Sequence, residues 1–139
     1  MKYDDASWHY DGDFPKDLPR EAGGTHIGMF LAWAILRDLL GELLKQGSAE
    51  SVQKVRERRM TGAQFLFKEC DEKLTDEDLS EVGNSFAQQY YEDNYLDDFC
   101  DVFDDVDDEI YRVEDSWSNF DRLVPTLDRR FREWQQGQE

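Results

Sequence analysis

The segment from Ile27 to Leu36 constrains the fold most, because it would form a helix that is apolar on every face. A helix of that kind must be surrounded by protein. The segment is about ten residues long, half of the ~20 residues that a membrane-spanning helix needs. Thr25 is a suitable N-cap and Gly47 a suitable stop. The pattern therefore predicts a buried central helix over residues 25–46.

The rest of the chain is expected to pack around this helix, because 139 residues are too few for two well-built cores. The predicted fold class is all-α: a single-domain helical bundle around the central helix. Residues 1–24 are expected to form an irregular, aromatic-rich N-terminal arm and loop, since turn residues and prolines follow its first half. The remaining predicted elements are a polar helix over 48–59, a short helix from Thr61 to Cys70, an acidic amphipathic helix and loop over 84–109, a short strand or turn over 110–113, and a C-terminal helix or helices over 116–135 with a break at Pro125.

The acidic residues are concentrated in one part of the chain. The net charge is −17, and residues 71–128 hold 20 of the 33 acidic side chains with only three basic ones, so the remainder is neutral. Solubility alone is one explanation of such a charge run. A spread-out distribution would give the same solubility with less self-repulsion, which favours a surface that captures a basic partner. Direct binding of nucleic acid is disfavoured, because phosphates require a basic surface.

The densest acidic stretch, residues 92–109, is therefore the predicted partner-binding site. The partner is expected to be a basic protein, with the carboxylates taking the place of phosphates. The binding residues are Asp93, Asp97, Asp98, Asp101, Asp104, Asp105, Asp107, Asp108 and Glu109. The aromatic residues at a spacing of four within this stretch fit the core better than the binding surface; they are Tyr91, Tyr95, Phe99 and Phe103. Arginines at 56–59 and 129–132 could instead fold back onto the carboxylates.

Motifs for catalysis, metal binding or cofactor binding are not found. The aspartate run 104–109 lacks the glycine and the ligand spacing of a calcium loop, and two histidines without paired thiols make zinc improbable. We therefore expect no enzyme activity, no metal and no cofactor. The N-terminus does not resemble a signal peptide, which indicates a cytoplasmic protein without a membrane segment. Cys70 and Cys100 are expected to be buried thiols rather than a disulfide. The sequence does not indicate an oligomeric state.

The alternative function is that of a small enzyme or ligand-binding protein. Its site would combine His9 and His26 with Asp4, Asp5, Asp11 or Asp13, in a pocket against Trp33. The structural explanation of His26 is a buried histidine bonded near the helix start, and that of His9 is an aromatic arm packed on the core. A concave pocket holding both histidines and carboxylates would favour this alternative. A convex, exposed acidic ridge would favour protein binding.

Several motifs along the chain resemble an uncharacterised family of small, acidic bacterial proteins. They are Tyr3-Asp4-Asp5-Ala6-Ser7-Trp8-His9-Tyr10, Asp13-Phe14-Pro15, Thr25-His26-Ile27-Gly28-Met29-Phe30-Leu31-Ala32-Trp33, the stretch from Cys70 to Leu79, Phe86-Ala87-Gln88-Gln89-Tyr90-Tyr91 and Asn119-Phe120-Asp121-Arg122-Leu123. The resemblance implies no particular activity. In size and charge the chain is similar to the immunity proteins that neutralise secreted bacterial toxins. That analogy implies a toxin or effector domain as the basic partner.

Overall fold

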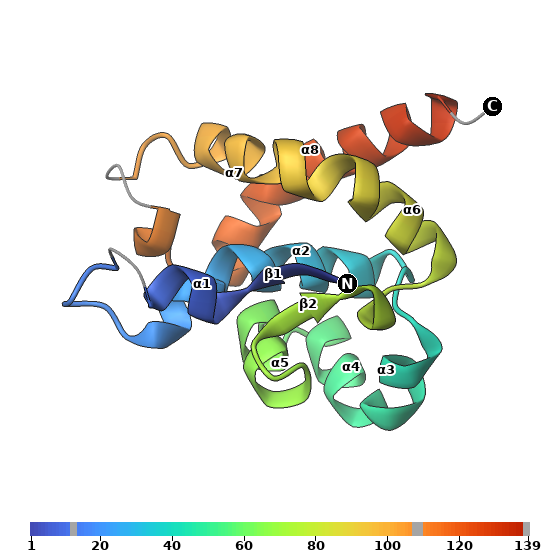
Figure 1. Cartoon of the computed structure of the whole chain (residues 1–139), viewed down its shortest axis with the longest axis horizontal. Coiled ribbons are helices and arrows are strands. Elements are labelled where there is room, and N and C mark those ends of the chain that lie inside the picture. Colours follow the sequence, from blue (N-terminus) through green and yellow to red (C-terminus); the bar gives the residue numbers. More distant parts are fainter. Residues whose placement is uncertain (12–13, 107–109, 138–139) are drawn as a thin grey trace.

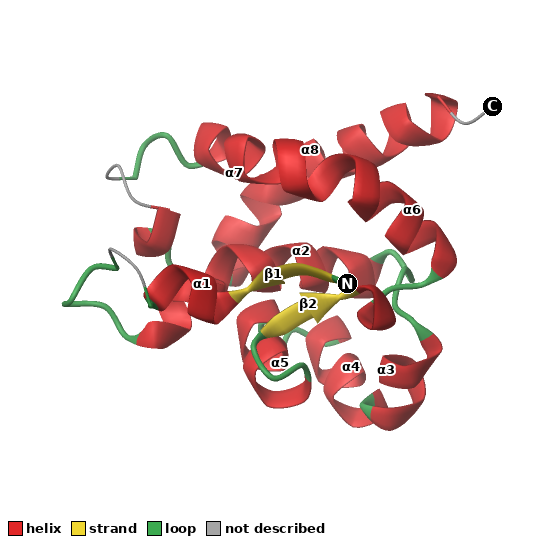
Figure 2. Cartoon of the chain, in the orientation of Figure 1, coloured by secondary structure: helices red, strands yellow, loops and turns green. Residues whose placement is uncertain are grey.

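The central element of the fold is α2 (Thr25–Leu36), in which every residue from Thr25 to Ile35 is buried. The structure, a computed structural model, describes residues 1–11, 14–106 and 110–137. Figure 1 shows α2 in the middle, with the segment from α6 to α8 on one side and α3 to α5 on the other. Helices dominate and one small sheet is present (Figure 2). The prediction of a mostly α-helical single domain around a buried helix is confirmed.

The predicted extent of the central helix, residues 25–46, is wrong, because α2 ends at Leu36. Asp38 takes the left-handed conformation, with a φ of 57°. The amide of Leu39 donates to the carbonyl of Ala34 at 2.8 Å, and that of Asp38 donates to Ile35 at 3.2 Å. This pair of bonds closes the helix as a Schellman cap, with aspartate where glycine is usual. The chain then restarts as α3 (Glu42–Gly47).

The N-terminal segment is more regular than predicted. It contains β1 (Lys2–Asp5), α1 (Ala6–Tyr10) and a 3₁₀ helix, η1 (Arg20–Gly24). β1 pairs antiparallel with β2 (Lys73–Thr75), and the amide of Ala6 continues the contact by donating to the carbonyl of Glu72. The prediction of an irregular arm is therefore wrong, because pairing with a distant strand supplies partners that local sequence does not reveal.

The layer beside the sheet contains α4 (Ala49–Arg56) and α5 (Gly62–Glu69). Thr61 caps α5 as predicted, in a capping box with Gln64. A Cβ atom added at Gly62 would collide with the carbonyl of Gly28, and one added at Gly28 would collide with the backbone at Ala63. These two glycines let the backbones of α2 and α5 touch.

The acidic amphipathic helix begins earlier than predicted, at Glu81 rather than residue 84. It begins at Glu81 with Ser80 as its N-cap and runs through α6 (Glu81–Tyr90), a π-helical turn η3 (Tyr91–Tyr95) and α7 (Leu96–Val102). The four aromatics of its inner face are all 5% exposed or less: Tyr91, Tyr95, Phe99 and Phe103. They belong to the core, so they are not anchors for a partner.

The C-terminal helix α8 (Trp117–Gly137) is continuous, and the predicted break at Pro125 is wrong. Leu123 and Leu127 are fully buried on either side of Pro125, so packing on the core holds the flanking turns despite the missing N–H. The strand or turn expected over 110–113 is the 3₁₀ helix η4 (Ile110–Arg112), and a further one, η2 (Asp76–Asp78), follows β2. No helix in the described part of the chain is both long and apolar enough to cross a membrane.

Candidate functional site

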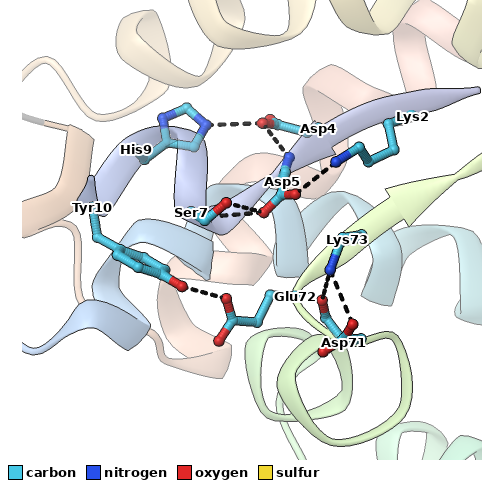
Figure 3. Close-up of polar contacts among 9 residues, drawn as sticks. All are labelled: Lys2, Asp4, Asp5, Ser7, His9, Tyr10, Asp71, Glu72 and Lys73. Atoms are coloured by element: carbon cyan, nitrogen blue, oxygen red, sulfur yellow. Dashed lines mark hydrogen bonds and ion pairs between the residues drawn. The ribbon is translucent and has the colours of Figure 1, made fainter. Parts of the chain in front are cut away.

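Three residues far apart in the sequence meet near the N-terminus: Asp4 of β1, His9 of α1 and His26 in the first turn of α2. A carboxylate oxygen of Asp4 and one ring nitrogen of each histidine all lie within 4.8 Å of one another. We call these three residues the Asp–His–His cluster. Figure 3 shows His9 and Asp4 facing each other across the junction of strand and helix.

Asp4 is the centre of the cluster and is 8% exposed. Its Oδ1 accepts hydrogen bonds from the backbone amide of Asp5 at 2.8 Å and lies 2.9 Å from Nε2 of His9. Its Oδ2 accepts from the hydroxyl of Tyr91 at 2.7 Å. Burial alone would raise the pKa of Asp4, but contacts with His26, His9 and Tyr91 outweigh it and hold this pKa well below its ordinary range. Asp4 is therefore a carboxylate near neutral pH.

His26 is 2% exposed and incompletely bonded. Its Nε2 lies 3.4 Å from Oδ2 of Asp4, yet this nitrogen makes no hydrogen bond. Its backbone carbonyl accepts from the hydroxyl of Tyr95. Burial lowers the pKa of His26 and Asp4 opposes the shift, so the ring is neutral near pH 7. The structural explanation of His26, a buried histidine hydrogen-bonded near the helix start, is right about burial and position but does not account for Nε2.

His9 links the cluster to the segment before α8. Its Nδ1 lies 2.8 Å from the hydroxyl of Tyr111, while its Nε2 faces Asp4. Its ring meets that of His26 edge to face, with centroids 4.5 Å apart. A hydroxyl both donates and accepts, so Tyr111 can satisfy either tautomer of His9.

Neighbouring polar contacts fix α1 against β1 (Figure 3). Asp5 caps α1 by accepting from the amide of Ser7 at 2.9 Å and from its hydroxyl at 2.7 Å, and it pairs with Lys2 at 3.0 Å. The hydroxyl of Tyr10 donates to Glu72 at 2.6 Å. Both carboxylate oxygens of Asp5 are therefore used in local contacts.

The other parts of the predicted histidine site lie elsewhere. Asp11 is exposed, and Asp13 lies outside the described residues. Trp33 is fully buried and donates its indole N–H to Asp128 at 2.9 Å. The placement of the pocket against Trp33 is therefore wrong.

A pocket of about 180 Å³ opens onto the cluster. Its wall includes both histidines and Asp4, and its lining residues are Tyr3, Asp4, Trp8, His9, His26, Tyr91, Glu92, Tyr95 and Leu96. Two of the lining residues, Trp8 and Leu96, are large apolar side chains that are 56% and 42% exposed. The concave site that would favour the alternative function is therefore present.

A larger apolar hollow of about 750 Å³ lies between η1, α5 and the segment after η4. Leu18, Phe67 and Val113 contribute to its walls, and Tyr111 lines it while bonding His9. Asp115 at its edge accepts from Thr61 at 2.7 Å. Its walls are mainly apolar, so it offers little that would select one ligand chemistry.

The structure divides the predicted partner-binding carboxylates into two groups. Asp93, Asp97, Asp101 and Asp104 are exposed, and within the described ranges none of the four makes an ion pair. By contrast, Asp98 is 6% exposed and is bound by Arg130 and Tyr90. Asp105 is exposed and pairs with Arg122 at 2.7 Å. The last three predicted binding residues, Asp107, Asp108 and Glu109, lie outside the described residues.

The arginines fold back onto acidic groups in part, as the alternative above allowed. Arg58 binds Asp121 through two hydrogen bonds, and Arg37 binds Asp128 in the same way. The acidic partners in these two pairs, Asp121 and Asp128, lie on α8, so the pairs leave the outer face of α7 negative.

Both cysteines are free thiols. Cys70 is half-buried, whereas Cys100 is exposed, so the prediction of two buried thiols is wrong for Cys100.

The Asp–His–His cluster brings together three residues that were named for the alternative function. They have no motif spacing, and His26 is separated from His9 by a loop that the sequence does not place. The available signal was that His9 lies in an aromatic motif beside aspartates, whereas His26 stands at the start of the apolar helix with no aspartate near it in sequence.

Comparison with known proteins gives one relationship. A family model, described as Domain of unknown function (DUF7832), matches residues 2–113, which include the whole Asp–His–His cluster and all nine predicted binding carboxylates. No curated protein and no solved structure matches the chain. Since the family model covers most of the 139 residues, the chain belongs to the family described as Domain of unknown function (DUF7832).

Proposed function

We propose that the chain is a protein-binding module whose acidic face captures a basic partner protein. The observation that supports this proposal best is a set of exposed carboxylates that make no ion pair with any described residue. They are Asp93, Asp97, Asp101 and Asp104. Asp93, Asp97 and Asp101 recur every four residues along the helical segment of η3 and α7, which places them on one face, and Asp104 follows in the turn after α7. We call these four residues the acidic row.

Two arginines of α8 are bound to carboxylates other than those of the acidic row. Arg130 and Arg122 are bound to Asp98 and Asp105, which lie between or beside the members of the row. A surface of one sign raises the association rate of a partner of opposite sign, and the effect declines as salt increases. Charge complementarity therefore favours a partner with a basic binding surface.

Apolar side chains lie at one end of the acidic row. Trp8 and Leu96 are largely exposed at the mouth of the pocket, and Glu92 lines the same pocket one residue before Asp93. A partly exposed tryptophan and leucine beside a charged rim match the anatomy of a protein interface, in which aromatic side chains supply much of the affinity. The proposed interface thus has its apolar centre at the pocket mouth and its acidic rim along α7.

The partner class follows from this chemistry. A basic protein domain that itself binds nucleic acid offers a surface that carboxylates can occupy in place of phosphates. In this proposal the chain acts as an immunity protein in the bacterial cytoplasm, where it blocks the active-site surface of a toxin or effector domain.

The test is binding to the basic domain encoded by the gene adjacent to that of this chain, measured by isothermal titration calorimetry. We expect affinity to fall as salt rises from 50 to 300 mM, as for any steered, charged interface. The triple substitution Asp97→Lys, Asp101→Lys and Asp104→Lys should abolish binding. Trp8→Ala should weaken binding by about tenfold or more without changing its salt dependence.

The matched control places the same charge reversal on the opposite side of α2. Glu42, Glu50 and Glu57 are exposed on or next to α3 and α4, and the variant carries lysine at all three positions. This control should retain most of the affinity. Equal losses in both triple variants would show that net charge alone matters, and unchanged affinity in the first variant would overturn the proposal.

A second candidate function is binding or conversion of a small ligand in the pocket. The observation that favours it is that this concave site contains both histidines and Asp4. A thermal-shift screen of small polar ligands tests it, because a ligand of this pocket raises the Tm of the wild type but not that of His9→Gln. Equal shifts in both proteins would count against this site.

A further inference from the structure

We propose that Asp4, His9 and His26 form a binding site for a divalent transition-metal ion, with zinc as the representative ion. The ion would lie between β1, α1 and α2, with its open coordination position facing the pocket. This site is independent of the acidic row and does not require a protein partner.

The donor set selects this class of metal. Two imidazole nitrogens and one carboxylate oxygen suit zinc and its neighbours in the first transition row, whereas calcium and magnesium prefer oxygen alone. Three protein ligands with a fourth position left open is the arrangement of zinc sites that bind water or substrate. The pocket of about 180 Å³ supplies that fourth position.

The most direct evidence is Nε2 of His26. This nitrogen is buried without a hydrogen-bond partner, on a side chain that is 2% exposed, and it points toward the carboxylate of Asp4. Buried polar atoms nearly always have a partner, and a bound ion is one of the recognised explanations when no protein group is in reach. A metal ion would use the lone pair that the protein leaves unused.

The two histidines face different oxygens of Asp4. Nε2 of His9 lies 2.9 Å from Oδ1, and Nε2 of His26 lies 3.4 Å from Oδ2. One oxygen of Asp4 and one nitrogen of each histidine lie within 4.8 Å of one another. Ligand atoms about 2.1 Å from a tetrahedral ion are about 3.4 Å from each other. A bound ion would therefore draw these three atoms closer together.

The surrounding groups orient the ligands as they do in known metal sites. Asp4 is held by the hydroxyl of Tyr91 at 2.7 Å and by the amide of Asp5 at 2.8 Å. Nδ1 of His9 lies 2.8 Å from the hydroxyl of Tyr111. Ligands are typically fixed in this way by a second layer of hydrogen bonds.

Nδ1 of His9 can stay hydrogen-bonded when Nε2 binds a metal ion. In the structure Nε2 faces the carboxylate of Asp4 and Nδ1 faces the hydroxyl of Tyr111. With metal, Nε2 offers its lone pair to the ion, any proton on Nε2 leaves to solvent, and the ring proton lies on Nδ1. The Tyr111 hydroxyl can accept that proton, because a hydroxyl both donates and accepts.

The test is titration of the metal-stripped wild type with zinc against a chromophoric chelator. We expect one tight site per chain, and a loss of about 100-fold or more in affinity in Asp4→Asn and in His9→Gln. The control Asp97→Asn with Asp101→Asn removes carboxylates from the acidic row, and a second control, Cys70→Ser with Cys100→Ser, removes both thiols. Both controls should bind zinc as the wild type does.

A measurement on the unaltered protein covers the case in which a variant fails to fold. The chain has only two histidines, so ¹⁵N imidazole spectra contain signals from His9 and His26 alone. Zinc should shift both sets of signals at one equivalent. Zinc binding that leaves these signals unchanged, or that is lost in the acidic-row control, would overturn the metal site while leaving the protein-binding proposal intact.

Discussion

Arg130 binds Asp98 through two parallel hydrogen bonds, from Nε to Oδ2 at 2.9 Å and from Nη2 to Oδ1 at 3.0 Å. The hydroxyl of Tyr90 donates to the same carboxylate at 2.7 Å. Its sequence neighbour Asp97 is exposed and makes no ion pair with any residue that the structure describes. Two adjacent aspartates of one acidic segment therefore differ in role: Asp98 joins α7 to α8, and Asp97 belongs to the surface.

Asp98→Ala should lower the free energy of unfolding by about 2–3 kcal/mol, since it removes a charged, mostly buried hydrogen-bond acceptor and leaves Arg130 without its partner. Asp97→Ala is the matched control and should change stability by about 0.5 kcal/mol or less, as for an ordinary surface position. Urea unfolding at pH 7 measures both. Similar losses in the two variants would contradict this division.

The contact between Gly28 and Gly62 gives a prediction about the core. Gly28→Ala and Gly62→Ala should each destabilise the protein by about 3 kcal/mol or more, because the added methyl group meets backbone that cannot move aside. Gly47→Ala is the control, since no atom lies within 4 Å of its added Cβ. Thermal unfolding followed by circular dichroism measures the three variants. A small loss at Gly62 would show that α2 and α5 can separate without cost.

The helical part of the fold was predictable because its signals are local. An apolar run defined α2, Thr61 marked the start of α5, and aromatics at a spacing of four marked the inner face of α7. The end of α2 was not predictable, because an aspartate at 38 performs the capping role usually taken by glycine.

The candidate site was less predictable than the helices. β1 exists because it pairs with β2, about seventy residues later, and that pairing brings Asp4 beside His26. The spacing of residues in the sequence does not predict this contact between Asp4 and His26. The sequence showed that residues 92–109 are rich in acidic side chains. It did not show which of these carboxylates are paired, because that depends on their contacts with Arg122 and Arg130 in the fold.

Asp115 gives a prediction about pH. Burial, with help from Glu114, raises its pKa, although the hydrogen bond from Thr61 opposes the shift. A raised pKa in the folded state means that folding favours the protonated acid, so the cost to stability grows as pH rises from the unfolded pKa and is complete above the folded pKa. Below its unfolded pKa of about 3.9 the cost is absent.

Asp115→Asn should therefore be more stable than the wild type at pH 7, because the amide still accepts from Thr61 and carries no charge. The difference should shrink toward zero at pH 3. Denaturant unfolding of both proteins at the two pH values measures it. A stability gain that persists unchanged at pH 3 would show that the charge of Asp115 is not the cause.

Cys100 gives the last prediction, on thiol reactivity. Burial raises the pKa of Cys70 far above its ordinary value, whereas Cys100 is exposed and its pKa is raised by partial burial and by Asp97 and Asp101. The thiolate is the reactive form, so exposure and charge set the rate together. In the native protein at pH 8 a disulfide reagent should modify Cys100 first, and slowly. Asp97→Asn with Asp101→Asn should speed this reaction severalfold, and Cys70 should react only after unfolding.

Added salt provides the control for this prediction. Salt should also accelerate the reaction of Cys100 in the wild type, because it screens the two aspartates, and it should have little effect on the double variant. A rate that is insensitive to both changes would mean that access rather than the field of the acidic row limits Cys100.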